Sequence, residues 1–120
     1  MERGRKMTEN SYKTPCGFIH YFVNIMDKQR ITLVFLPGLT ADHRLFEKQI
    51  EYFEKKQNVL VWDAPSHALS RPFANSYRLS DMAEWLYKIL VKRRNFIIPI
   101  IIGQSMGGYL AQNVYGIISG

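Results

Sequence analysis

The stretch Ile100-Ile101-Ile102-Gly103-Gln104-Ser105-Met106-Gly107-Gly108 decides the fold of this 120-residue chain. An apolar run, typical of a buried strand, ends at Gly103, and a segment compatible with a helix begins at Met106. Ser105 therefore falls at the tip of a sharp strand-to-helix turn, where a strained backbone is expected. Because the strand and the helix close on each other, the positions two before and two after the serine have little room for a side chain. Gly103 and Gly107 meet that demand.

The residues before this turn alternate between short apolar runs and stretches of helical periodicity. Asp42 is a plausible N-cap, and a proline in a central strand is best placed at its first residue, which puts Pro99 there. We expect a polar turn at residues 27–30 and a loop at 64–77. We expect strands over residues 18–25, 31–36, 59–62 and 99–102, and helices over residues 42–56, 80–94 and from 106 onward. Such alternation predicts right-handed βαβ units and a mostly parallel sheet flanked by helices.

Composition narrows the class of protein. Lysine and arginine number 16 against 10 acidic residues, a net charge of +6, but the positive residues are scattered, which argues against a nucleic-acid-binding role. The single cysteine, Cys16, permits no internal disulfide. Residues 1–15 are polar and predict a loose N-terminal lead without a secretory signal, followed by one domain over residues 16–120. No apolar run approaches the roughly 18 residues of a membrane span, so a cytoplasmic protein is the expectation.

Four motifs, in the right order, resemble those of the α/β-hydrolase superfamily over about residues 18–116. In the third, Ser66 and Ala68 stand where the family has two glycines, so we expect that turn to differ in detail. The motifs are Ile19-His20-Tyr21, Leu36-Pro37-Gly38-Leu39, Asp63-Ala64-Pro65-Ser66-His67-Ala68-Leu69-Ser70 and Gly103-Gln104-Ser105-Met106-Gly107-Gly108. The resemblance implies an α/β-hydrolase fold in which residues 16–120 form the N-terminal portion of the domain, ending after the strand and helix of the nucleophile elbow.

The same resemblance implies a chemistry. Ser105 would be the nucleophile of a serine hydrolase that acts on a small molecule with an acyl or similar carbonyl group. The backbone N–H groups of Leu39 and Met106 would form the oxyanion hole, and Gly103 and Gly107 would shape the elbow. The sequence shows no metal-ligand cluster and no phosphate-binding glycine loop, so it implies neither a metal nor a cofactor.

The family's triad continues after the serine with an acid and then a histidine, yet residues 106–120 contain no Asp, Glu or His. Each upstream candidate has a plainer structural interpretation: His20 as a sheet residue, His67 as a loop residue, and Asp63 as an acceptor within its own loop. His43 and Asp42 are expected at the start of a helix. We therefore expect the acid and the histidine to lie outside this sequence. Residues 1–120 alone should be inactive and either poorly soluble or loosely packed, with an open apolar edge at the elbow strand.

An alternative is a non-catalytic protein of the same fold that serves in binding or interaction. The intact elbow argues against it, because a protein without catalysis need not retain a strained serine. The bond cleaved, the lid and the oligomeric state stay open at this point.

Overall fold

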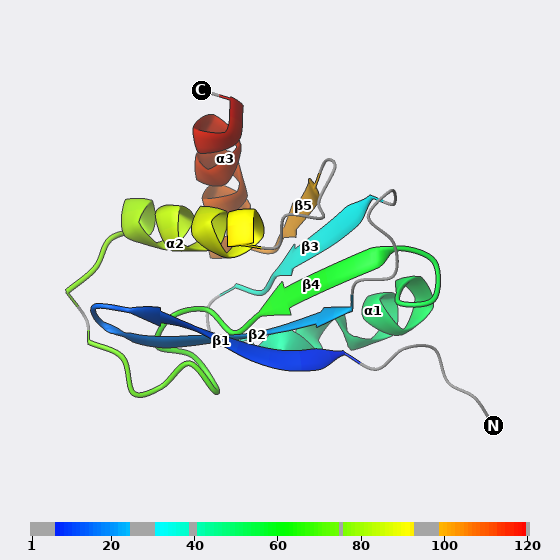
Figure 1. Ribbon diagram of the computed structural model, residues 1–120, viewed down its shortest axis with the longest axis horizontal. Helices are drawn as coiled ribbons and strands as arrows, with labels where there is room; N and C mark the ends of the chain where they lie inside the picture. The colour runs from blue at the N-terminus through cyan, green and yellow to red at the C-terminus, as the bar shows by residue number, and fades with distance from the viewer. Residues whose placement is uncertain (1–6, 25–30, 39–40, 75, 93–98, 120) are drawn as a thin grey trace.

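The computed structural model describes residues 7–24, 31–38, 41–74, 76–92 and 99–119. Within these residues the chain forms a mixed five-stranded sheet of order β1-β2-β4-β3-β5 (Figure 1). The strands are β1 (Thr8–Thr14), β2 (Gly17–Asn24), β3 (Thr32–Leu36), β4 (Asn58–Trp62) and β5 (Pro99–Gly103). The helices are a short 3-10 helix η1 (His43–Phe46), α1 (Glu47–Phe53), α2 (Leu79–Lys92) and α3 (Met106–Ser119).

The predicted parallel sheet forms its central part. β3 runs parallel to β4 on one side and to β5 on the other, whereas β2 pairs antiparallel with β4 and with β1. The carboxyl ends of the three parallel strands therefore meet at one edge, with Leu36 opposite Gly103 in the register. Loops that follow these strands gather at this edge, as in other open α/β sheets.

Alternate side chains of β3 and β4 enter two separate cores, which explains why both strands are buried over their whole length. Val34 and Leu60 pack with side chains of α2 and α3, such as Leu86 and Leu110. On the opposite face, Leu33, Phe35, Val59 and Val61 pack with Ile50 of α1. Figure 1 shows the resulting layers, with α2 and α3 on one side of the sheet and α1 on the other.

The prediction of a loose N-terminal lead is wrong over residues 8–14, which form β1. This strand pairs with β2 in an unbroken antiparallel register from Thr8–Val23 to Thr14–Gly17. The apolar signal in these residues is weak because β1 is an edge strand held mainly by backbone hydrogen bonds, and of its side chains only Thr14 is buried. The Thr14 hydroxyl also accepts from the N–H groups of Cys16 and Gly17, which closes the hairpin turn. The division at residue 15 stays a prediction, and residues 1–6 lie outside the described residues.

The other elements agree with expectation in position and differ at their ends. The predicted helix over residues 42–56 begins as a 3-10 turn and ends at Phe53, and Asp42 caps it by accepting from the Arg44 N–H at 2.8 Å. Pro99 is the first residue of β5, and α3 continues through Gly116 to Ser119. The predicted turn at residues 27–30, the end of the first strand at residue 25 and the helix end at residues 93–94 lie outside the described residues.

Candidate active site

Ser105 occupies the tip of the turn between β5 and α3, and its backbone φ is +60°, in the left-handed region that a residue with a Cβ atom rarely adopts. The neighbouring glycines are required by space. A Cβ atom on Gly103 would strike the Gly107 carbonyl, and one on Gly107 would strike the Leu36 carbonyl oxygen of β3. The tight turn that the sequence predicts is therefore present, and Ser105 is exposed at its tip.

The loop after β3 lies directly against this turn. The Gln104 N–H donates to the Leu36 carbonyl at 3.1 Å, and the Gln104 side-chain oxygen accepts from the Gly38 N–H, also at 3.1 Å. A Cβ atom on Gly38 would lie 2.9 Å from Cβ of Ser105. Gly38 thus brings the backbone of this loop into contact with the serine. Leu39, the next residue and one of the two predicted oxyanion donors, lies outside the described residues.

Met106, the other predicted donor, is the first residue of α3, a helix of 14 residues. The next two N–H groups, of Gly107 and Gly108, bond back to the carbonyls of Gln104 and Ser105. The Met106 N–H forms no hydrogen bond to the described residues. It lies at the positive end of the helix dipole, beside the serine, where a developing negative charge would be stabilised.

The carboxylate of Asp63 and the ring of His43 are hydrogen-bonded to each other, a pairing that the sequence did not predict. Asp63 follows β4, is fully buried, and its Oδ1 accepts from both the backbone N–H and the Nδ1–H of His43, at 2.7 and 2.8 Å. Its Oδ2 accepts from the Leu69 N–H at 3.3 Å, which agrees with the expectation that Asp63 fixes its own loop. The His43 ring packs on Phe22 with centroids 4.2 Å apart. This pair ties the start of η1 to the loop after β4.

The described histidines are all engaged away from Ser105. His20 Nδ1 lies 3.0 Å from the Glu9 carboxylate across the β1–β2 hairpin, a partner the sequence did not suggest. His67 Nδ1 donates to the Pro65 carbonyl at 3.0 Å, as expected for a loop residue. Within the described part of the chain, Ser105 Oγ forms no hydrogen bond. The structure therefore brings no general base to the serine from these residues.

The loop after β4 keeps a tight turn although it lacks the family's two glycines. Ser66 and Ala68 adopt φ values of +73° and +44°, so both hold a glycine-like conformation with a side chain in place. The Ser66 hydroxyl is 2.8 Å from the Tyr77 hydroxyl. The buried Ser70 hydroxyl donates to the Asp63 carbonyl at 2.6 Å and accepts from the His20 N–H at 2.8 Å, which anchors the loop to β2.

The described ranges contain no helix long and apolar enough to cross a bilayer. They also contain no group of three or more His, Cys, Asp or Glu side chains placed to hold a metal ion.

Comparison with known proteins identifies the family of this fold. The sequence profile of the alpha/beta hydrolase fold family matches residues 31–117, which is most of the chain. The chain belongs to this family. The matched region begins at β3 and includes the turn at Ser105 and nearly all of α3.

Individual relatives cover the same region. The chain is 29% identical over 82 residues to (E)-2-((N-methylformamido)methylene)succinate hydrolase of Acinetobacter baylyi. It superposes on the N-acyl homoserine lactonase AidH with a TM-score of 0.76 over 92% of the chain at 19% identity. It also superposes on an alpha/beta hydrolase from Novosphingobium aromaticivorans with a TM-score of 0.79 over 93% of the chain at 21% identity. The chain spans only 31% of the first protein and 40% of each of the other two.

Proposed function

We propose that this chain supplies the nucleophile of a serine hydrolase, with Ser105 as the attacking residue. The observation that carries the proposal is the left-handed backbone of Ser105, held between two glycines that have no room for a Cβ atom. A non-glycine residue in this region costs on the order of 1–3 kcal/mol. Such strain at an exposed serine beside a helix N-terminus is the arrangement a nucleophile requires.

In the proposed reaction, Ser105 Oγ attacks a substrate carbonyl carbon while a general base takes its proton. The carbonyl oxygen gains the negative charge, and the backbone N–H groups of Met106 and Leu39 stabilise it. Each donor lowers the activation barrier by about 2.7–4 kcal/mol. Collapse of this intermediate expels the alcohol or amine, which takes up a proton, and leaves an acyl group on Ser105. Water then hydrolyses the acyl-enzyme and restores the serine.

The substrate class we propose is a small molecule with an acyl or similar carbonyl group. The names of two similar proteins support it, because one is a hydrolase of a formamido compound and the other is an N-acyl homoserine lactonase. An ester, a lactone, a thioester or an amide would each present such a carbonyl group.

The proposal places the general base and its acid outside residues 1–120. Its support is that His43 Nδ1 is held by Asp63, and that neither His20 nor His67 bonds to Ser105 in the described residues. A serine without a base is a poor nucleophile at neutral pH. Residues 1–120 alone should therefore show negligible esterase turnover, and Ser105-dependent turnover by them would show that an upstream base suffices.

The test is the hydrolysis of p-nitrophenyl esters by the complete protein. We expect Ser105→Ala to lower kcat by about 10⁶-fold, the scale seen when the nucleophile of another serine hydrolase is removed. Ser80→Ala is the matched control, because Ser80 is exposed at the start of α2 and should leave turnover unchanged. Turnover that survives Ser105→Ala would contradict the proposal, and a complete protein that binds acyl compounds without turnover would favour the non-catalytic alternative.

A further inference from the structure

Gln104, the residue before the serine, is held by its backbone between two elements of the fold. Its N–H donates to the Leu36 carbonyl at the end of β3 at 3.1 Å. Its own carbonyl accepts from the Gly107 N–H in the first turn of α3 at 3.0 Å. The Gln104 side chain therefore starts from a fixed position beside the loop after β3.

The backbone N–H of Gly38, in that loop, depends on this side chain for its hydrogen bond. Gly38 is buried, and its N–H donates to Oε1 of Gln104 at 3.1 Å in a partly buried hydrogen bond. In the part of the chain that the structure describes, this N–H forms no other hydrogen bond. Buried backbone donors are almost always paired, because an unpaired one keeps the full cost of leaving water. The Gln104 side chain thus supplies an acceptor that the backbone lacks.

Gly38 and Gln104 are also fitted to each other by space. A Cβ atom on Gly38 would lie 2.5 Å from both the backbone oxygen and Oε1 of Gln104, and 2.9 Å from Cβ of Ser105. Cβ atoms essentially never approach other heavy atoms more closely than 3.0 Å. The absence of a side chain at Gly38 is therefore what lets its N–H reach Gln104. The two residues form one contact although they lie 66 positions apart in the chain.

This contact adjoins the proposed oxyanion hole. The peptide unit after Gly38 carries the N–H of Leu39, the second proposed donor, and its carbonyl oxygen accepts from the Ala41 N–H at 3.2 Å. Hydrogen bonds therefore hold Gly38 at both its N–H and its carbonyl. Donors stabilise an oxyanion only at roughly 2.7–3.1 Å, and a misplacement of about 1 Å can cost about 10²-fold in rate. A residue that fixes Gly38 against the serine turn thus sets the spacing of the two donors.

We propose that Gln104 is a positioning residue, which holds the loop after β3 at the spacing that the oxyanion hole requires. This inference rests on the role proposed for Ser105. The side chain acts through the peptide unit between Gly38 and Leu39 and does not touch the substrate. A glutamine suits this task because its Oε1 is an acceptor without a charge. A glutamate could accept the same hydrogen bond, but its negative charge would repel the developing oxyanion.

The first test is the hydrolysis of p-nitrophenyl esters by the complete protein. Gln104→Leu removes the acceptor and should lower kcat about tenfold, less than the roughly 10²–10³-fold loss when an oxyanion donor is removed outright. KM should stay within about twofold, because the lost interaction serves the transition state. Gln104→His keeps an uncharged acceptor, the ring Nε2, at a similar reach and should recover most of the lost kcat. Gln104→Glu should remain as slow as Gln104→Leu.

Amide hydrogen exchange of Gly38, followed by NMR in the complete protein, measures the contact without catalysis. Exchange should be about fivefold faster in Gln104→Leu than in the wild type, because the native hydrogen bond of this amide is lost. It should stay close to the wild-type rate in Gln104→His and Gln104→Glu. Gln104→Glu should therefore combine a protected Gly38 amide with a low kcat, a result that a purely structural role would not give.

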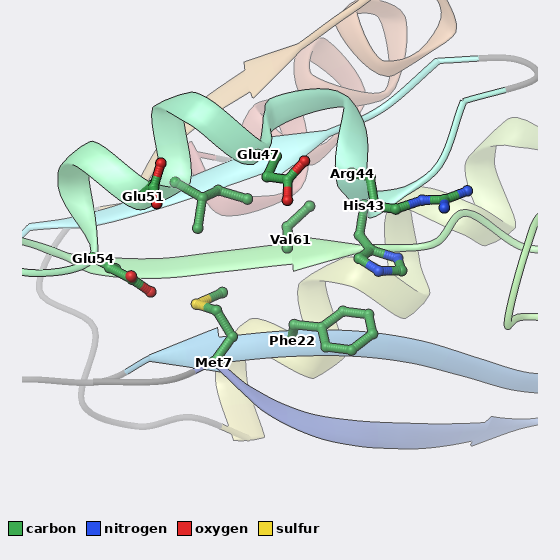
Figure 2. Close-up of a pocket in the computed structure, with 9 residues that line it drawn as sticks. Met7, Phe22, His43, Arg44, Glu47, Glu51, Glu54 and Val61 are labelled. Atoms are coloured by element: carbon green, nitrogen blue, oxygen red, sulfur yellow. The ribbon is translucent and has the colours of Figure 1, made fainter. Parts of the chain in front are cut away.

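Gln49→Leu is the matched control. Gln49 is exposed on α1, the helix that carries Glu47 and Glu51 in Figure 2, and α1 lies on the opposite side of the sheet from α3 (Figure 1). Both kcat and the exchange of the Gly38 amide should be unchanged in this variant.

Three results would overturn the positioning role and leave Ser105 as the nucleophile. They are an unchanged kcat in a folded Gln104→Leu variant, unchanged exchange of its Gly38 amide, and no gain of kcat in Gln104→His over Gln104→Leu. Absent turnover by the complete wild-type protein, or turnover that survives Ser105→Ala, would instead overturn the proposed function and the positioning role with it.

Discussion

The turn at Ser105 and the loop after β4 both deviate from ordinary backbone geometry, and they do so for different reasons. At the first, Gly103 and Gly107 have unexceptional φ values but no space for a Cβ atom. At the second, Ser66 and Ala68 have positive φ values but enough space for their side chains. A glycine needed for space has no substitute, whereas a glycine needed for its conformation can be replaced at a cost of about 1–3 kcal/mol. This difference explains why the chain keeps one pair of the family's glycines and not the other.

The largest loss of stability is expected at a glycine that has no room for a Cβ atom. Gly103→Ala should destabilise the complete protein by about 4 kcal/mol or more, because the new methyl group meets backbone atoms of Gly107 that cannot move separately from α3. Gly108→Ala is the matched control, since the nearest atom to its Cβ would be 3.8 Å away and alanine favours a helix. Unfolding in urea measures both. Equal stability of the two variants would show that the turn is not crowded.

The next largest loss of stability is expected when the hydrogen bond between His43 and Asp63 is removed. His43→Ala should destabilise the protein by about 2 kcal/mol, because it leaves the fully buried Asp63 carboxylate with backbone donors alone. This loss of stability is smaller than for a fully buried pair because the His43 side chain is 28% exposed. His67→Ala is the comparison, since His67 bonds only to the Pro65 carbonyl, and it should cost less than about 1 kcal/mol. The order of the two variants in a denaturant titration tests the assignment.

Where a positive φ is the constraint, substitution by glycine should raise the stability of the protein. Ala68→Gly should stabilise it by about 1 kcal/mol, because the left-handed backbone at this position no longer carries a Cβ atom. Ala74→Gly, in the same loop but without a positive φ, should instead destabilise it slightly. A higher melting temperature for the first variant and a lower one for the second would confirm the comparison. Destabilisation by both would refute it.

The smallest change in stability is expected at Asp42, which caps the start of η1. The hydrogen bond from the Arg44 side chain holds the pKa of Asp42 below its usual range, so the cap contributes stability above the unfolded pKa of about 4 and loses it as the pH falls through the folded value. Asp42→Ala should cost about 1 kcal/mol at pH 7 through loss of the cap. The difference between this variant and the wild type should shrink toward pH 2 in thermal unfolding. A difference that grows on acidification would contradict the role of the ionised carboxylate.

Much of this arrangement was predictable because local patterns determine it. The apolar run that ends at Gly103, the proline at residue 99 and the cap at Asp42 each act within a few residues, and all three are confirmed. β1 was missed because an edge strand needs few apolar side chains. The pairing of His43 with Asp63 was missed because it joins residues 20 positions apart, across adjacent parallel strands whose order the sequence does not state.

The central claim is that the strained serine at the β5–α3 turn is a nucleophile. The most direct test treats the complete protein with a fluorophosphonate and maps the labelled residue by peptide mass spectrometry. The account predicts a single modification at Ser105, lost in Ser105→Ala and retained in Ser80→Ala. A complete, folded protein that takes up no label, or one labelled at another serine, would contradict it.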